Sequence, residues 1–275
     1  MQSVLAKKDD GSIILTITIP QDQITQARKS VMEDIQKNAN IPGFRKGMAP
    51  ADLVEQSVSE PQVREDILKK LLPTSYIAAV DEHKLRPILN PKIHVETIED
   101  GKDWTYTAET CEMPEITLGD YKKKVQEVNA KSKIVIPGQE EKQPSFEEIV
   151  KVLLDTIKIA VPDILLEQET DRLLSQTLNE IKSLGLSLDQ YLGSTGKTVE
   201  MLREEYKMRA RNDVMVEFAL QKIAEEEKLT ISPEEVQHAL SEAKDEKEKE
   251  SLKANQYLLA SILRQQKTLD FLKSL

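Results

Sequence analysis

No regular helix or strand can run through residues 41–50, and this interruption constrains the fold more than any other stretch of the chain. The sequence there is I-P-G-F-R-K-G-M-A-P. Pro42 and Pro50 each fix φ at about −65°, lack an N–H donor and keep the preceding residue out of the helical region. Gly43 and Gly47 allow positive φ and close backbone approach. We therefore expect a stiff loop that joins two separate elements.

The centre of this loop combines one aromatic side chain with two cations. Phe44, Arg45 and Lys46 stand between the two glycines, and the ten residues contain no acid. An exposed phenylalanine favours a partner that covers it, and adjacent cations favour a phosphate-rich partner. The alternative is an ordinary turn between two helices, with Phe44 folded back into a core.

Composition limits the class of protein. Of the 275 residues, 31% are charged, 39% are hydrophobic and 4% are aromatic, and the net charge is −10. These proportions are typical of a helix-rich protein of about two domains with small cores. Because an acidic body repels nucleic acid, a contact with phosphates has to be local, as at residues 41–50.

Cysteine and histidine usage argues against a metal site. Cys111 is the only cysteine, which excludes an intrachain disulfide and a cysteine cluster. His83, His94 and His238 lie far apart and show no ligand spacing. The N-terminus has no apolar run of signal-peptide length, and no stretch approaches a membrane span. We expect a cytoplasmic protein that does not contact membranes.

Residues 1–115 predict an α+β domain. Alternating β-branched residues predict a hairpin over 2–19 with its turn at 9–11. Asp22 is a candidate N-cap for the helix that leads into the loop. The remaining elements are helices over 51–57 and 60–83 and strands over 92–97 and 104–111. The prediction is an antiparallel sheet of about four strands that carries helices.

The rest of the chain differs in character. Residues 116–145 predict a linker, because prolines and glycines recur there on either side of a run of three lysines. Residues 146–275 predict an elongated all-α domain. Pro162 suits the first turn of a helix, and Ser232-Pro233-Glu234-Glu235 forms a capping box. The expected helices span 146–160, 162–184, 198–228, 232–249 and 255–275.

Residues 191–198, Y-L-G-S-T-G-K-T, nearly match a phosphate-binding loop. The motif needs glycine where Tyr191 stands, and it needs a preceding strand, whereas residues 175–190 have a helical pattern. We interpret the segment as a flexible tip between two helices, with Thr198 as the N-cap of the second. An enzyme that binds nucleotides here is the alternative.

Met201, Met208 and Met215 recur every seven residues along one expected helix. Methionines suit adaptable apolar surfaces, so a partly exposed groove is one interpretation, and ordinary core packing is the other. The sequence places no set of residues that would form a catalytic site. We therefore expect that the protein is not an enzyme.

The loop, its position and the layout together resemble the trigger factor family, bacterial chaperones that dock beside the ribosomal exit tunnel. The family signature G-F-R-x-G-x-x-P stands here, preceded by a hairpin and followed by the strand pair around Trp104. Many family members carry lysine where Met48 stands, so this tip is expected to depend less on charge. The resemblance implies a ribosome-binding tip made of Gly43, Phe44, Arg45, Lys46, Gly47 and Pro50.

The resemblance implies an ATP-independent chaperone with no cofactor and no metal. Its expected partners are the large ribosomal subunit, through RNA and protein at the tunnel exit, and nascent or unfolded polypeptides. Family members usually carry a prolyl-isomerase domain of the FK506-binding type, for which residues 121–146 leave no room, so we expect no isomerase activity. A homodimer of the chaperone off the ribosome stays open. The alternatives to this function are a ribosome-independent holdase and a helical module that oligomerises. The candidate client-binding residues are Met201, Met208, Met215 and Leu259.

Overall fold

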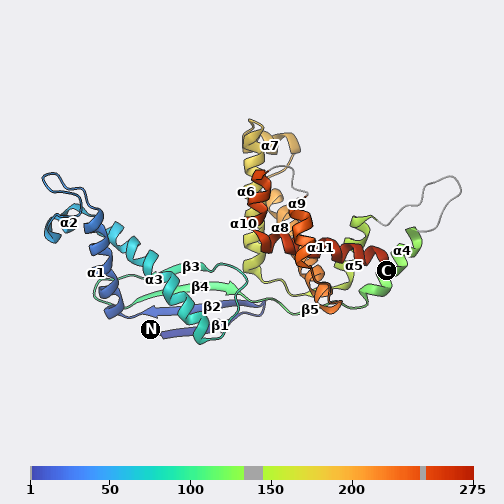
Figure 1. Ribbon diagram of the computed structural model, residues 1–275, viewed down its shortest axis with the longest axis horizontal. Coiled ribbons are helices and arrows are strands. Elements are labelled where there is room, and N and C mark those ends of the chain that lie inside the picture. The colour runs from blue at the N-terminus through green and yellow to red at the C-terminus, as the bar shows by residue number, and fades with distance from the viewer. Residues whose placement is uncertain (1, 133–144, 242–245) are drawn as a thin grey trace. The chain divides into compact units, whose positions relative to one another are not determined.

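The computed structural model describes residues 2–132, 145–241 and 246–275 (Figure 1). The chain divides into two compact units. The first consists of Met1–Met113 with Pro162–Leu165, and the second of Pro114–Val161 with Leu166–Leu275. Within the described residues, no helix is both long enough and apolar enough to cross a membrane.

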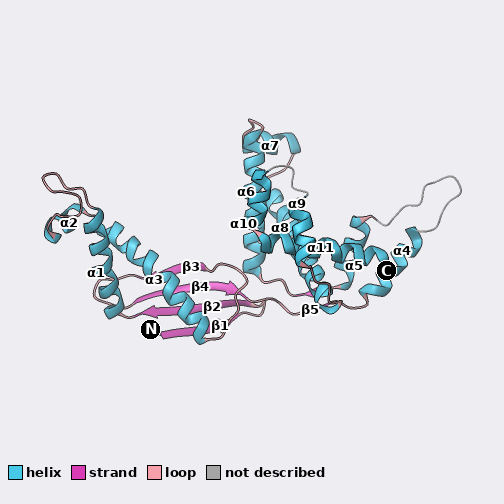
Figure 2. Cartoon of the chain, viewed as in Figure 1, coloured by secondary structure: helices cyan, strands magenta, loops and turns pink. Residues whose placement is uncertain are grey.

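The first unit contains a four-stranded antiparallel sheet in the order β1-β2-β4-β3 (Figure 2). In the central pair, Leu15 lies opposite Ala108 and Ile17 opposite Tyr106, and all four are buried. Because side chains alternate along a strand, these residues share the apolar face of the sheet. The predicted hairpin and strand pair are confirmed. The strands are β1 (Gln2–Lys7), β2 (Ser12–Ile19), β3 (Lys92–Thr97) and β4 (Trp104–Cys111).

Three helices complete the first unit: α1 (Gln21–Asn38), α2 (Ala51–Ser57) and α3 (Glu60–Glu82). Val31 of α1 and Ile67 of α3 belong to the same buried cluster as Tyr106, so both helices pack on the apolar face of the sheet. The predicted N-cap was wrong. Pro20 takes that place in an extended conformation, and Asp22 lies in the first turn. The fixed φ and missing N–H of proline allow it to end β2 and begin α1 at once.

The second unit is mostly helical, as predicted, with one short strand pair in which β5 (Ile116–Thr117) lies antiparallel to β6 (Lys158–Ile159). The Oγ1 of Thr198 accepts from the N–H of Met201 at 3.2 Å, and Ser232 and Glu235 cap each other. Both predicted helix starts are confirmed. The helices are α4 (Tyr121–Ser132), α5 (Phe146–Thr156), α6 (Asp163–Ser183), α7 (Leu188–Thr195), α8 (Val199–Glu226), α9 (Pro233–Ser241), α10 (Glu246–Ala254) and α11 (Gln256–Ser274).

Residues 116–132 form β5 and α4, where we predicted a linker. Tyr121 and Val125 are buried, and the Nδ2 of Asn129 donates to the carbonyl of Leu272 at 3.0 Å. The three α4 residues recur every fourth position and therefore share one face of the helix. Three exposed lysines lie between Tyr121 and Val125, so the sequence does not show a clear apolar pattern there. The remaining part of the predicted linker, residues 133–144, lies outside the described residues.

Two predicted helices in the second unit are shorter than expected. The one predicted over 146–160 ends at Thr156 as α5, and β6 follows it. β-Branched residues at 156, 157 and 159, followed by Pro162, favour extended backbone over helix there. The helix predicted over 232–249 is described as α9 and α10, on either side of residues 242–245, which lie outside the described part of the chain.

Candidate functional site

The loop at residues 41–50, here called the tip loop, links α1 to α2. Its glycines Gly43 and Gly47 have φ of +91° and +78°, in the left-handed region that the sequence predicts. The N–H of Gly47 donates to the carbonyl of Ala39 at 3.2 Å. A Cβ at Gly47 would lie 2.8 Å from the carbonyl oxygen of Lys37, whereas Gly43 has no such neighbour within 4 Å. Gly47 is therefore required both by its φ and by the close approach of the loop to α1.

The tip loop turns twice and presents its central side chains to solvent. The N–H of Phe44 donates to the carbonyl of Ile41 at 3.1 Å, and the N–H of Met48 to that of Arg45 at 2.9 Å. Phe44 is 42% exposed and Met48 is 71% exposed. Arg45 and Lys46 are exposed and form no ion pair with any described residue. The loop thus offers one ring, one thioether and two unpaired cations to a partner.

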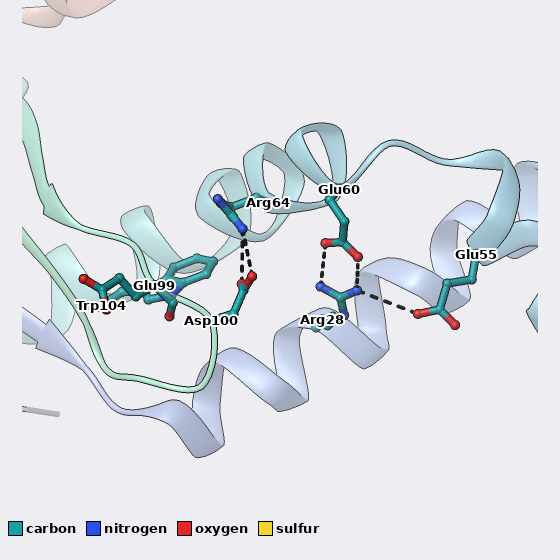
Figure 3. A network of polar contacts seen from close by, with 7 residues as sticks. All are labelled: Arg28, Glu55, Glu60, Arg64, Glu99, Asp100 and Trp104. Atoms are coloured by element: carbon teal, nitrogen blue, oxygen red, sulfur yellow. Dashed lines mark hydrogen bonds and ion pairs between the residues drawn. The ribbon is translucent and has the colours of Figure 1, made fainter.

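A network of ion pairs fixes the helices on either side of the tip loop (Figure 3). Arg28 of α1 donates to both carboxylate oxygens of Glu60 in α3, at 3.0 and 2.5 Å, and lies 3.7 Å from Glu55 of α2. The hydrogen bond from Arg28 lowers the pKa of Glu60. Arg64 of α3 contacts Asp100 of the β3–β4 turn at 3.1 Å. The contacts of Arg28 tie α2, which follows the tip loop, and α3 to α1.

The exit of the tip loop is buried although its centre is not. Ala49 is 2% exposed and Val54 of α2 is fully buried. The Nε2 of Gln36, in the last turn of α1, donates to the carbonyl of Ala49 at 2.8 Å. The end of the tip loop is therefore packed against α1 and α2. This packing holds the backbone that carries the exposed side chains.

The second unit contains a groove of about 680 Å³ between α8 and α11, here called the α8–α11 groove. Tyr257 at its edge is 96% exposed. The Nε of Arg264 is buried and has no hydrogen-bond partner among the described residues, while its Nη2 lies 4.0 Å from Glu225. Polar and charged side chains, among them Glu217, Gln221 and Lys228, line the groove beside its apolar residues, so it suits a chain segment that is apolar in part. The apolar lining consists of Leu220, Ala224, Leu229, Ile231 and Ala260.

The four predicted client-binding residues differ in how far they are exposed. Met201 and Met208 on α8 are 56% and 67% exposed. Met215 is half-buried. Leu259 of α11 is only 8% exposed, so it belongs to the packing of the helical unit and offers almost no contact area. The exposed apolar neighbours of Leu259 are Tyr257, Leu258 and Ile262.

The segment that resembles a phosphate-binding loop is helical where we predicted a flexible tip. Ser187 and Gln190 cap the start of α7, and Gly196 ends it in the left-handed conformation. Lys197 forms an ion pair with Glu205 of α8. A phosphate cradle needs backbone N–H groups that point at the ligand, and here those of residues 191–195 belong to a helix. The geometry does not support a nucleotide site at this position.

Two family models match the chain. The model described as bacterial trigger factor protein matches residues 1–143, and the model of the trigger factor C-terminus matches residues 119–274. The chain belongs to the trigger factor family. The two matches overlap over residues 119–143, so no interval between them is left for a domain of another type.

Related proteins support the assignment over part of their length. A trigger factor of Streptococcus pneumoniae (strain JJA) is 38% identical over 135 residues, and that of strain CGSP14 is 37% identical over the same length. In both cases the match covers 49% of this chain and 32% of the relative, so the chain spans about a third of the curated relatives it matches. A solved structure described as "Promiscuous Substrate Recognition in Folding and Assembly Activities of the Trigger Factor Chaperone" covers 100% of this chain and 99% of its own, with a TM-score of 0.66. At 15% identity it shows a shared fold.

The structure adds candidate functional residues that the sequence alone did not single out. Gln36 and Arg28 support the tip loop, and Tyr257 and Arg264 line a groove. The arginine on α1 and the glutamate at the start of α3 could have been paired only if the contact between those helices had been known. The groove depends in the same way on the pairing of α8 with α11.

Proposed function

We propose that this chain docks on the large ribosomal subunit through the tip loop and holds nascent or unfolded polypeptides in its helical unit. The observation that carries the docking proposal is the exposed ring of Phe44 next to two unpaired cations on a fixed backbone. Arg45 and Lys46 can pair with RNA phosphates or with acidic side chains at the tunnel exit. Phe44 would supply the apolar anchor that fixes the position of docking.

The holding proposal rests on apolar surface in the second unit. The α8–α11 groove and the exposed Met201 and Met208 offer contacts that adapt to different sequences. Each contact is weak, and several together delay the aggregation of an unfolded chain without consuming energy. The helical state of residues 191–195 agrees with a mechanism that needs no ATP.

We also propose that the chain has no cofactor and no prolyl-isomerase activity. The two family matches leave no interior interval for an isomerase domain, which supports this view. A tetrapeptide isomerisation assay should show only the uncatalysed rate, and robust catalysis would contradict the proposal. Docking on ribosomes would place the protein in the cytoplasm, where fractionation should find it with the ribosomes.

Co-sedimentation with ribosomes tests the docking proposal. Wild-type protein should pellet with the large subunit, and Phe44→Ala/Arg45→Ala/Lys46→Ala should stay in the supernatant. A matched control is Ile77→Ala/Arg86→Ala/Lys29→Ala, which removes one exposed apolar side chain and two exposed cations elsewhere in the first unit. Equal pelleting of wild type and the tip variant would reject the role of the loop.

The same variants separate the proposal from its alternatives. Both triple variants should suppress aggregation of a chemically denatured enzyme as well as the wild type does, because the helical unit is unchanged. Aggregation suppression without any ribosome binding by the wild type would favour a ribosome-independent holdase. Light scattering that shows concentration-dependent oligomers without either activity would favour an oligomerising module.

A further inference from the structure

Gln36 in the last turn of α1 and Ala39, the C-cap of this helix, hold the tip loop at two points. The carbonyl of Ala39 accepts from the N–H of Gly47 at 3.2 Å, and the Nε2 of Gln36 donates to the carbonyl of Ala49 at 2.8 Å. Among the described residues, Gln36 is the one side chain that hydrogen-bonds the backbone of residues 41–50. The bond spans 13 positions of the chain and bridges the entry and the exit of the loop.

The acceptor of this bond lies in a covered part of the loop. Ala49 is 2% exposed, so its carbonyl has limited access to water. A carbonyl that loses its donor in such surroundings favours conformations that expose it to solvent. Removal of the Gln36 amide would therefore loosen the exit of the loop while the cations and the ring at the tip stay the same.

We propose that Gln36 is a positioning residue for docking, which keeps the tip loop in the conformation that the ribosome binds. The inference rests on the proposed function, and it goes beyond the family signature because Gln36 lies outside it. Gln36 acts on the loop through the Ala49 carbonyl and need not touch the partner. It raises the fraction of free protein that is ready to bind, and this fraction multiplies the association rate.

Gln36→Met tests the proposal, since methionine matches glutamine in length, has similar helix propensity and carries no donor or charge. The loss of one net hydrogen bond should lower the association rate roughly threefold to tenfold and leave the dissociation rate nearly unchanged. In the free protein, the backbone amides of Gly47 and Met48 should exchange faster with solvent. Gln26→Met, at an exposed position on the same helix, is the matched control and should change neither quantity.

The outcomes distinguish this inference from the proposed function. The positioning role would be overturned if Gln36→Met had the association and exchange rates of the wild type. If Phe44→Ala still bound ribosomes weakly, the docking proposal would stand. A change in the dissociation rate alone would also overturn it, because Gln36 would then be a contact residue. A wild-type protein that does not bind ribosomes would overturn both. A far-ultraviolet circular dichroism spectrum of Gln36→Met that matches the wild type should accompany the expected result.

Discussion

The tip loop and the α8–α11 groove expose apolar side chains in two different ways. The tip loop places a single ring next to two cations, on a backbone with a left-handed glycine on either side. The groove spreads its apolar lining over two helices and the turn that follows α8, and no single side chain dominates it. A small, fixed surface suits one partner of constant shape, whereas a broad, adaptable surface suits many unrelated sequences. The proposed docking and holding roles follow this division.

The largest expected effect is the loss of the single ring. If Phe44 is the anchor of docking, Phe44→Ala should weaken ribosome binding roughly 30-fold, because a hot-spot side chain contributes about 2 kcal/mol or more. Tyr257→Ala, at the exposed edge of the groove, should change aggregation suppression by less than about twofold, as expected for one of many near-neutral contacts. Binding titrations and aggregation assays on both variants measure the contrast. If Tyr257→Ala reduced aggregation suppression more than Phe44→Ala weakened ribosome binding, the contrast between the tip loop and the groove would be wrong.

The next effect concerns the stiffness of the loop. A side chain in the left-handed region costs about 1–2 kcal/mol, so Gly43→Ala should weaken binding by about fivefold to 30-fold. Gly47→Ala adds a Cβ at 2.8 Å from the Lys37 carbonyl and should weaken binding further. Neither change should reduce aggregation suppression. If Gly43→Ala weakened binding more than Gly47→Ala, the close contact of the loop with α1 at Gly47 would not be needed for binding.

A smaller effect concerns the balance of charge and apolar surface at the tip. With Arg45 and Lys46 as the cations of the tip, log K should fall with log [salt] at a slope of about −1.4, if each meets one RNA phosphate at about −0.7 per contact. Met48→Lys should steepen this slope by about 0.7 if the new lysine also meets a phosphate. Titrations at several salt concentrations give both values. A wild-type affinity that does not depend on salt would show that the cations contact no phosphates.

The smallest effect lies in the helical unit. Lys122, 2.6 Å from Glu227, lowers the pKa of that carboxyl, and the hydroxyl of Tyr121 also donates to it. A lowered folded-state pKa gives stability that is present above the unfolded pKa and lost as the pH falls through the folded value. Glu227→Gln should therefore lower the free energy of unfolding at pH 7 by at most about 1 kcal/mol, with a smaller difference in acid.

Thermal unfolding of Glu227→Gln and wild type at pH 7 and at acidic pH measures this effect. Ribosome binding should not change, since the pair anchors α4 to the end of α8 in the second unit. If Glu227→Gln and the wild type had the same stability at both pH values, the ion pair would be too exposed to contribute to the free energy of unfolding.

Local pattern was enough to predict the elements that depend on neighbouring residues. The alternation in β2, the positive φ of both tip glycines and the caps at Thr198 and Ser232 all follow from short-range chemistry, and the structure confirms them. The α+β unit followed by helices is confirmed for the same reason. What failed locally was the N-cap of α1, where Pro20 competes with Asp22.

Features that depend on contacts far apart in the sequence could not be predicted in this way. The buried face of α4 could be predicted only if its contact with α11 were known, because α11 packs beside α4 and accepts the hydrogen bond from Asn129. The α8–α11 groove and the Gln36 bond likewise need the packed helices and the folded loop. Leu259 illustrates the reverse case, because its apolar character suggested a client contact and the packing buries it.

The central claim is that the ring at position 44 contacts the ribosome. Replacing Phe44 with the photo-reactive analogue p-benzoylphenylalanine keeps an aromatic group there and allows crosslinking to bound ribosomes under light. The account predicts crosslinks to large-subunit components at the tunnel exit, and their loss when unlabelled wild-type protein competes. Crosslinks confined to the chain itself, with the protein bound to ribosomes throughout, would contradict it.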